Sequence, residues 1–144
     1  MKMKNSKDLL DSVLKTTQMG QIGIRSILKI PLRASLRAEL NSQLKEYDAI
    51  ETEANNIAAA RGWEPEELDP ATKMMATMWS RTKLAYGNAD SKIAAMMING
   101  NTKGMIKGLK NTHHSTNMDP RIKALSQKLL DYESANIRQM QGFV

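Results

Sequence analysis

The sequence predicts an all-α protein, an antiparallel up-down four-helix bundle formed by a single domain of 144 residues. Three observations predict this class. Apolar residues recur at alternating spacings of four and three in four separate stretches, which is the repeat of an amphipathic helix. Aromatic residues make up only 4% of the chain, whereas strands are enriched in them. The connections between the stretches are short, which favours antiparallel neighbours.

The first stretch predicts a helix over about 6–29. Ser6 is a suitable N-cap residue, and Asp8 places a negative charge in the first turn. Pro31 disfavours helix at Ile30 and suits the first turn of a new helix. We therefore expect the chain to reverse at this point; a single kinked helix is the alternative.

The longest predicted helix covers about 32–61, a length of roughly 45 Å. Gly62 follows it and is expected to end it, because glycine readily adopts the left-handed conformation found after a helix. The connection that follows, 63–69, reaches at most about 25 Å when fully extended. This is too short to run back along the helix, so simple up-down-up-down order is favoured over a long crossover.

A third helix is predicted over about 70–98, because Asp69 and Pro70 form a cap followed by a proline at the first helical position. The pattern weakens at Asn99 and Gly100, and a separate short helix is possible over about 101–111. Three glycines would lie on one face of that helix, where they would let a neighbouring backbone come close. We expect this glycine line to serve packing rather than ligand binding. It consists of Gly100, Gly104 and Gly108.

The last predicted helix covers about 119–141 and begins with a second cap and proline, Asp119 and Pro120. Before it lies a polar loop that contains His113 and His114, which we expect to lie outside the helices. Two adjacent histidines could bind zinc or nickel, but without nearby Cys, Asp or Glu ligands a solvated loop is favoured.

Polar residues interrupt the apolar stripe of every predicted helix, near the middle of the first three and later in the last. If these levels coincide, the bundle contains a buried polar layer, whose members must be hydrogen-bonded to avoid a large cost. The expected layer consists of Thr17, Gln21, Gln43, Tyr47, Thr82, Tyr86, Glu133 and Asn136.

Glu133 is the residue of this layer that carries the sharpest expectation. We expect it to be buried beside Tyr47 or Gln43 and held by hydrogen bonds rather than by a metal ion. Burial would raise its pKa, whereas hydrogen-bond donors would oppose that rise. The sequence leaves open which effect is larger.

The chain has no cysteine, which excludes disulfides, thiolate nucleophiles and cysteine-based metal sites. Its beginning lacks the unbroken apolar segment of a signal peptide, and no apolar run approaches the length of a membrane span. We therefore expect a cytoplasmic protein with no membrane span.

The formal net charge is +6, and the segment 99–128 holds much of the positive charge. A solvated face is the favoured interpretation, and an anion-binding face is the alternative. Nucleic acid is possible but not favoured, because no aromatic residues alternate with the lysines to stack on bases. The candidate anion-binding residues are Lys103, Lys107, Lys110, Arg121 and Lys123.

The segments 94–109, AAMMINGNTKGMIKGL, and 123–140, KALSQKLLDYESANIRQM, resemble small uncharacterised bacterial members of the ferritin-like superfamily, as does 42–54 more weakly. The resemblance implies a four-helix bundle. Superfamily members that bind two irons carry Glu-x-x-His on two helices. This chain departs from that pattern, because Glu133 is followed by Asn136 and Glu51 by Ala54. The resemblance therefore implies the fold without its di-iron chemistry.

Three functional hypotheses follow. The first is a non-enzymatic ferritin-like bundle that acts through protein–protein contacts, as a homodimer and without a cofactor, since its eleven methionines suit adaptable contact surfaces. The second is binding of an anion or nucleic acid by 99–128. The third is a metal-binding oxidoreductase, for which the weak ligand candidates are Glu51, Glu133, His113 and His114.

Overall fold

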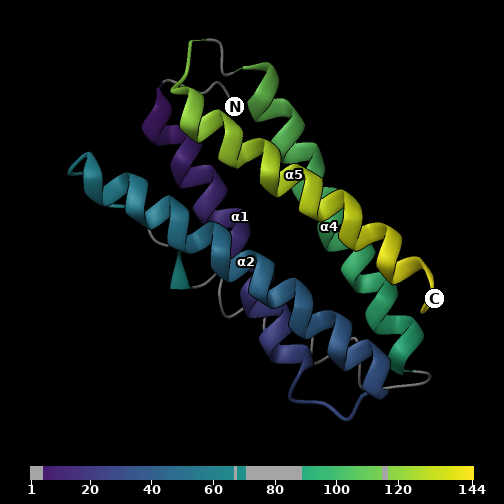
Figure 1. Ribbon diagram of the computed structural model, residues 1–144. Helices are drawn as coiled ribbons and strands as arrows, with labels where there is room; N and C mark the ends of the chain where they lie inside the picture. Colours follow the sequence, from purple (N-terminus) through teal and green to yellow (C-terminus); the bar gives the residue numbers. More distant parts are fainter. Residues whose placement is uncertain (1–4, 67, 71–88, 115–116) are drawn as a thin grey trace.

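The computed structural model describes residues 5–66, 68–70, 89–114 and 117–144. Four helices form its framework: α1 (Ser6–Ile27), α2 (Ala34–Ala60), α4 (Ala89–His113) and α5 (Pro120–Gln141). The described residues contain no strand, so the predicted all-α bundle is confirmed (Figure 1). The predicted helix start at residue 70 leads into 71–88, which lie outside the described residues together with the expected layer members Thr82 and Tyr86.

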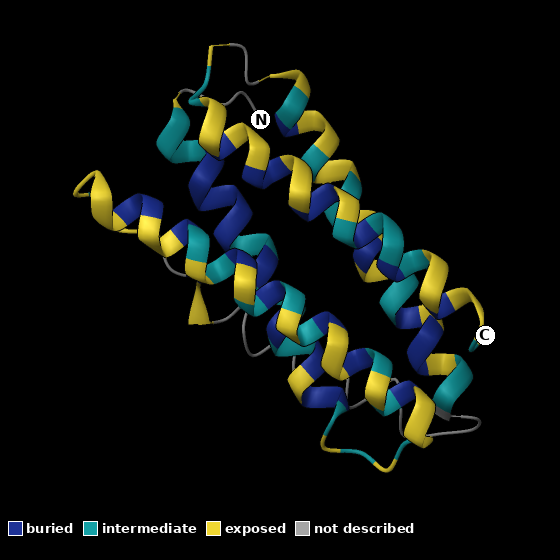
Figure 2. Ribbon diagram, viewed as in Figure 1, coloured by how far each residue is buried: buried dark blue, intermediate teal, exposed yellow. Residues whose placement is uncertain are grey.

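The apolar stripes predicted from the four-three spacing form the core. On α2, for example, the stripe residues are almost fully enclosed, and the buried positions of all four helices face one another (Figure 2). The α2 core residues are Leu36, Leu40, Ile50, Ala54 and Ile57. None of the helices, within the part of the chain that is described, combines the length and hydropathy needed to cross a bilayer.

The reversal predicted near Pro31 is present, so the alternative of one kinked helix is wrong. α1 ends at Ile27 and α2 begins at Ala34. The carbonyl groups of the connection need hydrogen-bond donors as well, and Arg37 supplies two. Its guanidinium donates to the carbonyl oxygens of Leu28 at 2.9 Å and Ile30 at 2.8 Å.

The start of α1 differs from the prediction by one residue. Asn5, not Ser6, is the N-cap, because its side-chain oxygen accepts a hydrogen bond from the backbone N–H of Asp8 at 2.9 Å. The Ser6 hydroxyl instead accepts from the backbone N–H of Asp119 at 2.9 Å. Ser6 therefore joins the beginning of α1 to the beginning of α5.

α4 corrects two expectations. The weak point at Asn99 and Gly100 does not end the helix, so the described part of the predicted helix 70–98 and the predicted short helix 101–111 belong to one continuous element. His113, expected in a loop, is its last residue, and His114 follows in a turn. A glycine inside a helix costs only about 1 kcal/mol relative to alanine. The packing contacts of α4 offset this cost at Gly100.

The other end of α2 matches its prediction. Gly62 has a φ of 68°, the left-handed conformation expected after a helix. Beside it, Arg61 forms an ion pair with Asp119, the N-cap of α5. At the opposite end of α2, Arg33 pairs with Asp90 in the first turn of α4 at 2.7 Å. These contacts tie α2 to the beginnings of both later helices.

We predict that Arg37→Ala lowers the free energy of unfolding by about 1–3 kcal/mol, since it leaves the carbonyl groups of Leu28 and Ile30 without their charged donor. Chemical denaturation measures the change. Arg25→Ala is the matched control, because Arg25 is exposed and its ion pair with Asp48, at 3.4 Å, is exposed as well. Its loss should change stability by less than about 1 kcal/mol. Equal losses in both variants would contradict the role given to Arg37.

Candidate functional site

The polar layer is the part of the core with the most unusual chemistry. Its six members within the described residues are all buried, with at most 3% of each residue exposed, and they come from α1, α2 and α5. They are Thr17, Gln21, Gln43, Tyr47, Glu133 and Asn136. Residues at alternating spacings of four and three lie on one face of a helix, so these polar residues lie on the same inner faces as the leucines.

Tyr47 stands in the middle of the layer. Its hydroxyl donates a hydrogen bond to the side-chain oxygen of Asn101 on α4 at 3.0 Å. Its ring lies against α1 at Gly20, where a Cβ atom would come within 2.7 Å of two ring carbons. Burial, followed by the nearby charge of Glu133, raises the pKa of Tyr47, so its hydroxyl keeps its proton and acts as a donor.

Glu133 lies against the backbone of α4. Only 2% of the residue is exposed, and a Cβ atom on Gly104 would come within 2.6 Å of its Oε1 atom. Gly108 meets Leu130 in the same way, with Leu130 Cδ2 also 2.6 Å from the added atom. Gly104 and Gly108 therefore let α5 side chains, rather than the backbone that the sequence suggested, reach the α4 backbone. Gly100, the third member of the predicted line, has nothing within 4 Å of an added Cβ atom.

The protonation of Glu133 follows from its burial. Burial raises the pKa of this carboxyl from 4.5 to about 8, so Glu133 is mostly a neutral acid at pH 7. Of the two effects that the sequence left open, burial is the larger. The expectation that hydrogen bonds hold the group is corrected for Oε2, which is enclosed and has no hydrogen-bond partner among the described residues.

Gln21 differs from the rest of the layer because its amide reaches toward the outside. The amide nitrogen donates to Asp48 at 2.8 Å and to Glu51 at 3.3 Å, both on α2. Glu51, a weak metal-ligand candidate from the sequence, is therefore engaged with Gln21. Gln43 points elsewhere and donates to Gln139 of α5 at 3.4 Å.

Several enclosed polar atoms in the layer have no hydrogen-bond partner in the described part of the chain. They include both acceptors and donors, which matters for what could bind there. These atoms are Thr17 Oγ1, Gln43 Oε1, Asn101 Nδ2, Glu133 Oε2 and both amide atoms of Asn136. A cavity of about 10 Å³ adjoins Glu133 and is also lined by Ser12, Thr16, Gly104 and Asn111.

The sequence reasoning missed the contribution of α4 to this region. Asn101 and Asn111 are 4% and 7% exposed, and the Asn111 amide donates to the Ser12 hydroxyl of α1 at 2.6 Å. A signal was present, because Asn101, Gly104, Gly108 and Asn111 follow one another at spacings of three, four and three. The predicted glycine line contained Gly104 and Gly108, but the asparagines on either side of these two glycines were not assigned to the inner face.

The five candidate anion-binding residues are all exposed. None of the three α4 lysines among them, Lys103, Lys107 and Lys110, forms an ion pair with a described acid, whereas Lys128 of the same basic segment lies 3.8 Å from Glu53 of α2. Burial, and then the nearby charge of Lys15, lower the pKa of Lys107. The basic segment is thus partly paired at α5 and positively charged along α4.

The metal-ligand candidates do not come together. Within the described ranges, no three His, Asp or Glu side chains lie close enough to hold a metal ion. His113 and His114 are exposed at the end of α4, away from Glu133. Glu133 itself has amides, a glycine and a tyrosine around it.

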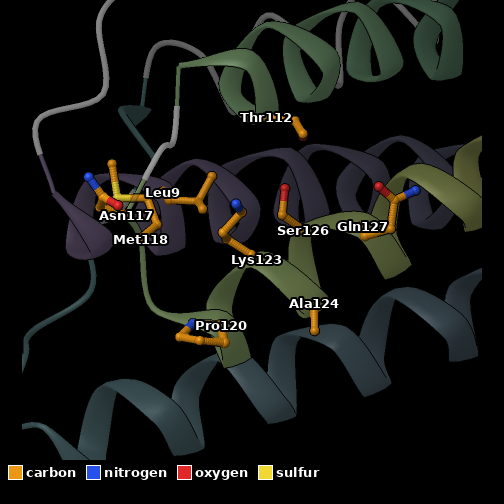
Figure 3. Close-up of a pocket in the computed structure, with 9 residues that line it drawn as sticks. All are labelled: Leu9, Thr112, Asn117, Met118, Pro120, Lys123, Ala124, Ser126 and Gln127. Carbon is orange, nitrogen blue, oxygen red and sulfur yellow. The ribbon is translucent and has the colours of Figure 1, made fainter.

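A second, more open cavity of about 530 Å³ lies where the beginnings of α1 and α5 meet the end of α4 (Figure 3). Leu9, Met118 and Thr112 line it together with Lys123, one of the candidate anion-binding residues. The nearby N-terminus of α5 is already used, because the Asp119 carboxylate accepts a hydrogen bond from the Arg121 N–H at 2.8 Å. An external anion would have to compete with that carboxylate.

Comparisons with known proteins identify the fold. The chain is similar to the structure of a DUF305 fragment from Deinococcus radiodurans, with a TM-score of 0.76 and 13% identity over 98% of this chain and 95% of that one. It is also similar to YcfI from Rhodopseudomonas palustris, described as "a putative structural protein", with a TM-score of 0.64 and 15% identity over 98% and 96% of the two chains. No protein-family model and no curated protein sequence matches it. At these identities the likeness shows the fold alone.

We predict that alanine has opposite effects at two glycines of α4. Gly100→Ala should raise the free energy of unfolding by about 0.5–1 kcal/mol, since alanine is the better helix former and nothing lies within 4 Å of the added atom. Gly104→Ala should lower it by about 1–3 kcal/mol, because Glu133 has little room to move away. Thermal or chemical denaturation of both variants measures this; stabilisation by Gly104→Ala would show that α4 and α5 are not in close contact there.

We also predict that stability falls as pH rises through the range set by Glu133. The folded protein keeps the Glu133 proton up to about pH 8, whereas the unfolded chain releases it near pH 4.5. The stabilising contribution is therefore complete below 4.5 and lost above 8, at up to about 1.4 kcal/mol per pH unit. Denaturation at several pH values across this range should show a slope that Glu133→Gln removes. Equal slopes in both proteins would exclude Glu133 as the cause.

Proposed function

We propose that the protein is a non-enzymatic helical bundle that acts through protein–protein contacts, and that the outer side of α4 makes them. The observation that carries this proposal is a pair of exposed apolar side chains. Ile106 and Leu109 are 49% and 47% exposed. Fully burying a side chain of this size contributes about 1.5–3 kcal/mol, so a partner that covered the pair would gain a useful part of that energy.

The charge around this pair indicates what the partner's surface is like. Lys103, Lys107 and Lys110 lie on the same side of α4, between and beside the two apolar residues, and the helix has no acid after Asp90. The positive charge would steer a partner of complementary charge toward this face and would disfavour partners that are positively charged. We therefore propose an acidic protein surface with a central apolar patch as the partner.

A second copy of the chain is the other candidate, and the same apolar pair favours it. In a symmetric dimer through this face, however, the three lysines of one subunit would face the three of the other. Nucleic acid would meet the lysines favourably, but residues 103–110 contain no aromatic side chain on which bases could stack. Charge thus supports an acidic partner over either alternative.

The finer assignments that accompany this proposal rest on the same features. The short connections between α1 and α2 and between α4 and α5 support an antiparallel, ferritin-like arrangement. A neutral Glu133 among amides supports a role without metal chemistry. A chain without cysteine suits the reducing cytoplasm, which we propose as its location.

The sign of the salt dependence distinguishes the two protein partners. Self-association through α4 should strengthen as salt screens the facing lysines, whereas binding of an acidic chain, probed with labelled poly-glutamate, should weaken. Light scattering measures self-association, and fluorescence anisotropy measures poly-glutamate binding. A gel shift with duplex DNA tests nucleic-acid binding. We expect a salt-sensitive poly-glutamate complex that Lys107→Ser weakens.

The control for charge is Lys45→Ser, which removes an exposed lysine of α2 and should leave poly-glutamate binding unchanged. The double variant Ile106→Ser, Leu109→Ser tests the apolar pair, and it should abolish any self-association while the variant stays folded. If Lys45→Ser and Lys107→Ser weaken poly-glutamate binding equally, the α4 face has no special role. A dimer that persists in the double variant would place self-association on another surface.

A further inference from the structure

Ferritin-like proteins that bind two irons hold them inside the bundle with glutamates and histidines, and the chain's own atoms test whether such a centre fits beside Glu133. Metal ions need lone pairs from every neighbour, and iron in such bundles is held mostly by carboxylates and histidines. In the described residues, Glu133 is the one fully buried carboxyl of the layer, whereas Glu39 and Glu46 on α2 are partly exposed residues with one enclosed oxygen each. Asn136 stands where a histidine would be needed, and no three His, Asp or Glu side chains of the described chain come together. The donor set does not fit a di-iron centre.

The groups around the cavity beside Glu133 point to a different guest. Glu133 Oε2 is enclosed without a hydrogen-bond partner among the described residues, and the Ser12 hydroxyl and the Asn111 amide on the same wall can both donate and accept. A cation would satisfy the acceptors only, and the amide N–H groups would then face a positive charge. The guest must therefore both donate and accept.

Size narrows the choice to the smallest such molecule. The cavity beside Glu133 has a volume of about 10 Å³, close to the roughly 10–15 Å³ that one water molecule occupies by this measure. Its wall carries polar groups from three helices, including Ser12 of α1, Asn111 of α4 and Glu133 of α5. A buried water usually makes about three hydrogen bonds, and this wall supplies groups of the right kind.

We propose that the cavity beside Glu133 is a binding site for ordered water in place of metal, and that Glu133 serves it as a neutral hydrogen-bonding group. The water bridges Glu133 to the polar side chains of α1 and α4, which do not reach it directly. The raised pKa of Glu133 agrees with this arrangement, because a neutral carboxyl both donates and accepts. The bound water then joins α1, α4 and α5, each of which contributes polar groups to the wall of the cavity.

Two measurements on the full chain test the proposal. Magnetic relaxation dispersion of water oxygen-17 detects long-lived internal water. Metal analysis of the protein, after incubation with ferrous or manganous ions and desalting, detects bound metal. We expect a long-lived water signal in the wild type, its retention in Glu133→Gln, its reduction in Glu133→Leu, and no bound metal above background. Stoichiometric metal that Glu133→Gln loses would overturn the proposal, as would a wild type without long-lived water.

Glu133→Leu leaves several polar groups without a partner and can fail to fold, so a second variant covers this case. Ser126 lines the same cavity from α5 and is 6% exposed. Ser126→Val replaces the hydroxyl group with a methyl group, adds a second methyl group and keeps Glu133, and we expect it to reduce the water signal. Gly23→Ala is the control, because nothing lies within 4 Å of the added atom. A water signal that Ser126→Val and Glu133→Leu both leave intact would place the water elsewhere and reject the site.

Discussion

The contact between Glu133 and the α4 backbone at Gly104 is the constraint on which the middle of the bundle depends. The Glu133 carboxyl occupies the space that a side chain at position 104 would fill, so it has no room for a hydration shell and stays neutral at pH 7. Its neutrality in turn permits an apolar seam above and below it, formed by Leu129 and Met140 of the same helix. The glycine, the acid and the seam thus depend on one another.

The polar layer and the apolar core have different roles in specifying the structure. Leucine and isoleucine residues contact each other favourably in many relative positions of two helices, because their attraction has no direction. The Tyr47–Asn101 and Asn111–Ser12 hydrogen bonds form in only one position. Buried polar groups that lose their partners cost about 1–3 kcal/mol each, so helices that slip past one another are penalised. The core supplies stability, and the layer selects among alignments.

The sequence predicted most of this arrangement and failed at identifiable places. The four-three spacing located the inner faces of α1, α2 and α5, including Glu133 and Asn136, because periodicity reports which side of a helix is enclosed. It did not show that α4 continues past Gly100, since local propensity is weaker than tertiary packing. It could not show that Gly104 meets Glu133, because spacing along one helix says nothing about the alignment of its neighbour. The N-cap error at Ser6 has a similar origin, as the hydroxyl is used by a residue 113 positions away.

The hydrogen bonds of Arg37 have a consequence for the order in which the chain assembles. They join residues only seven and nine positions apart, so little chain entropy is lost when the α1–α2 hairpin closes. The Gln43–Gln139 contact, by comparison, joins residues 96 positions apart. Local contacts of this kind form fastest, so the first two helices are the natural starting unit, and α5 completes the interior only after the rest of the chain has been made. A nascent chain that leaves the ribosome N-terminus first would therefore present half of its core, with Thr17, Gln43 and Tyr47 open to solvent, until its last helix arrives.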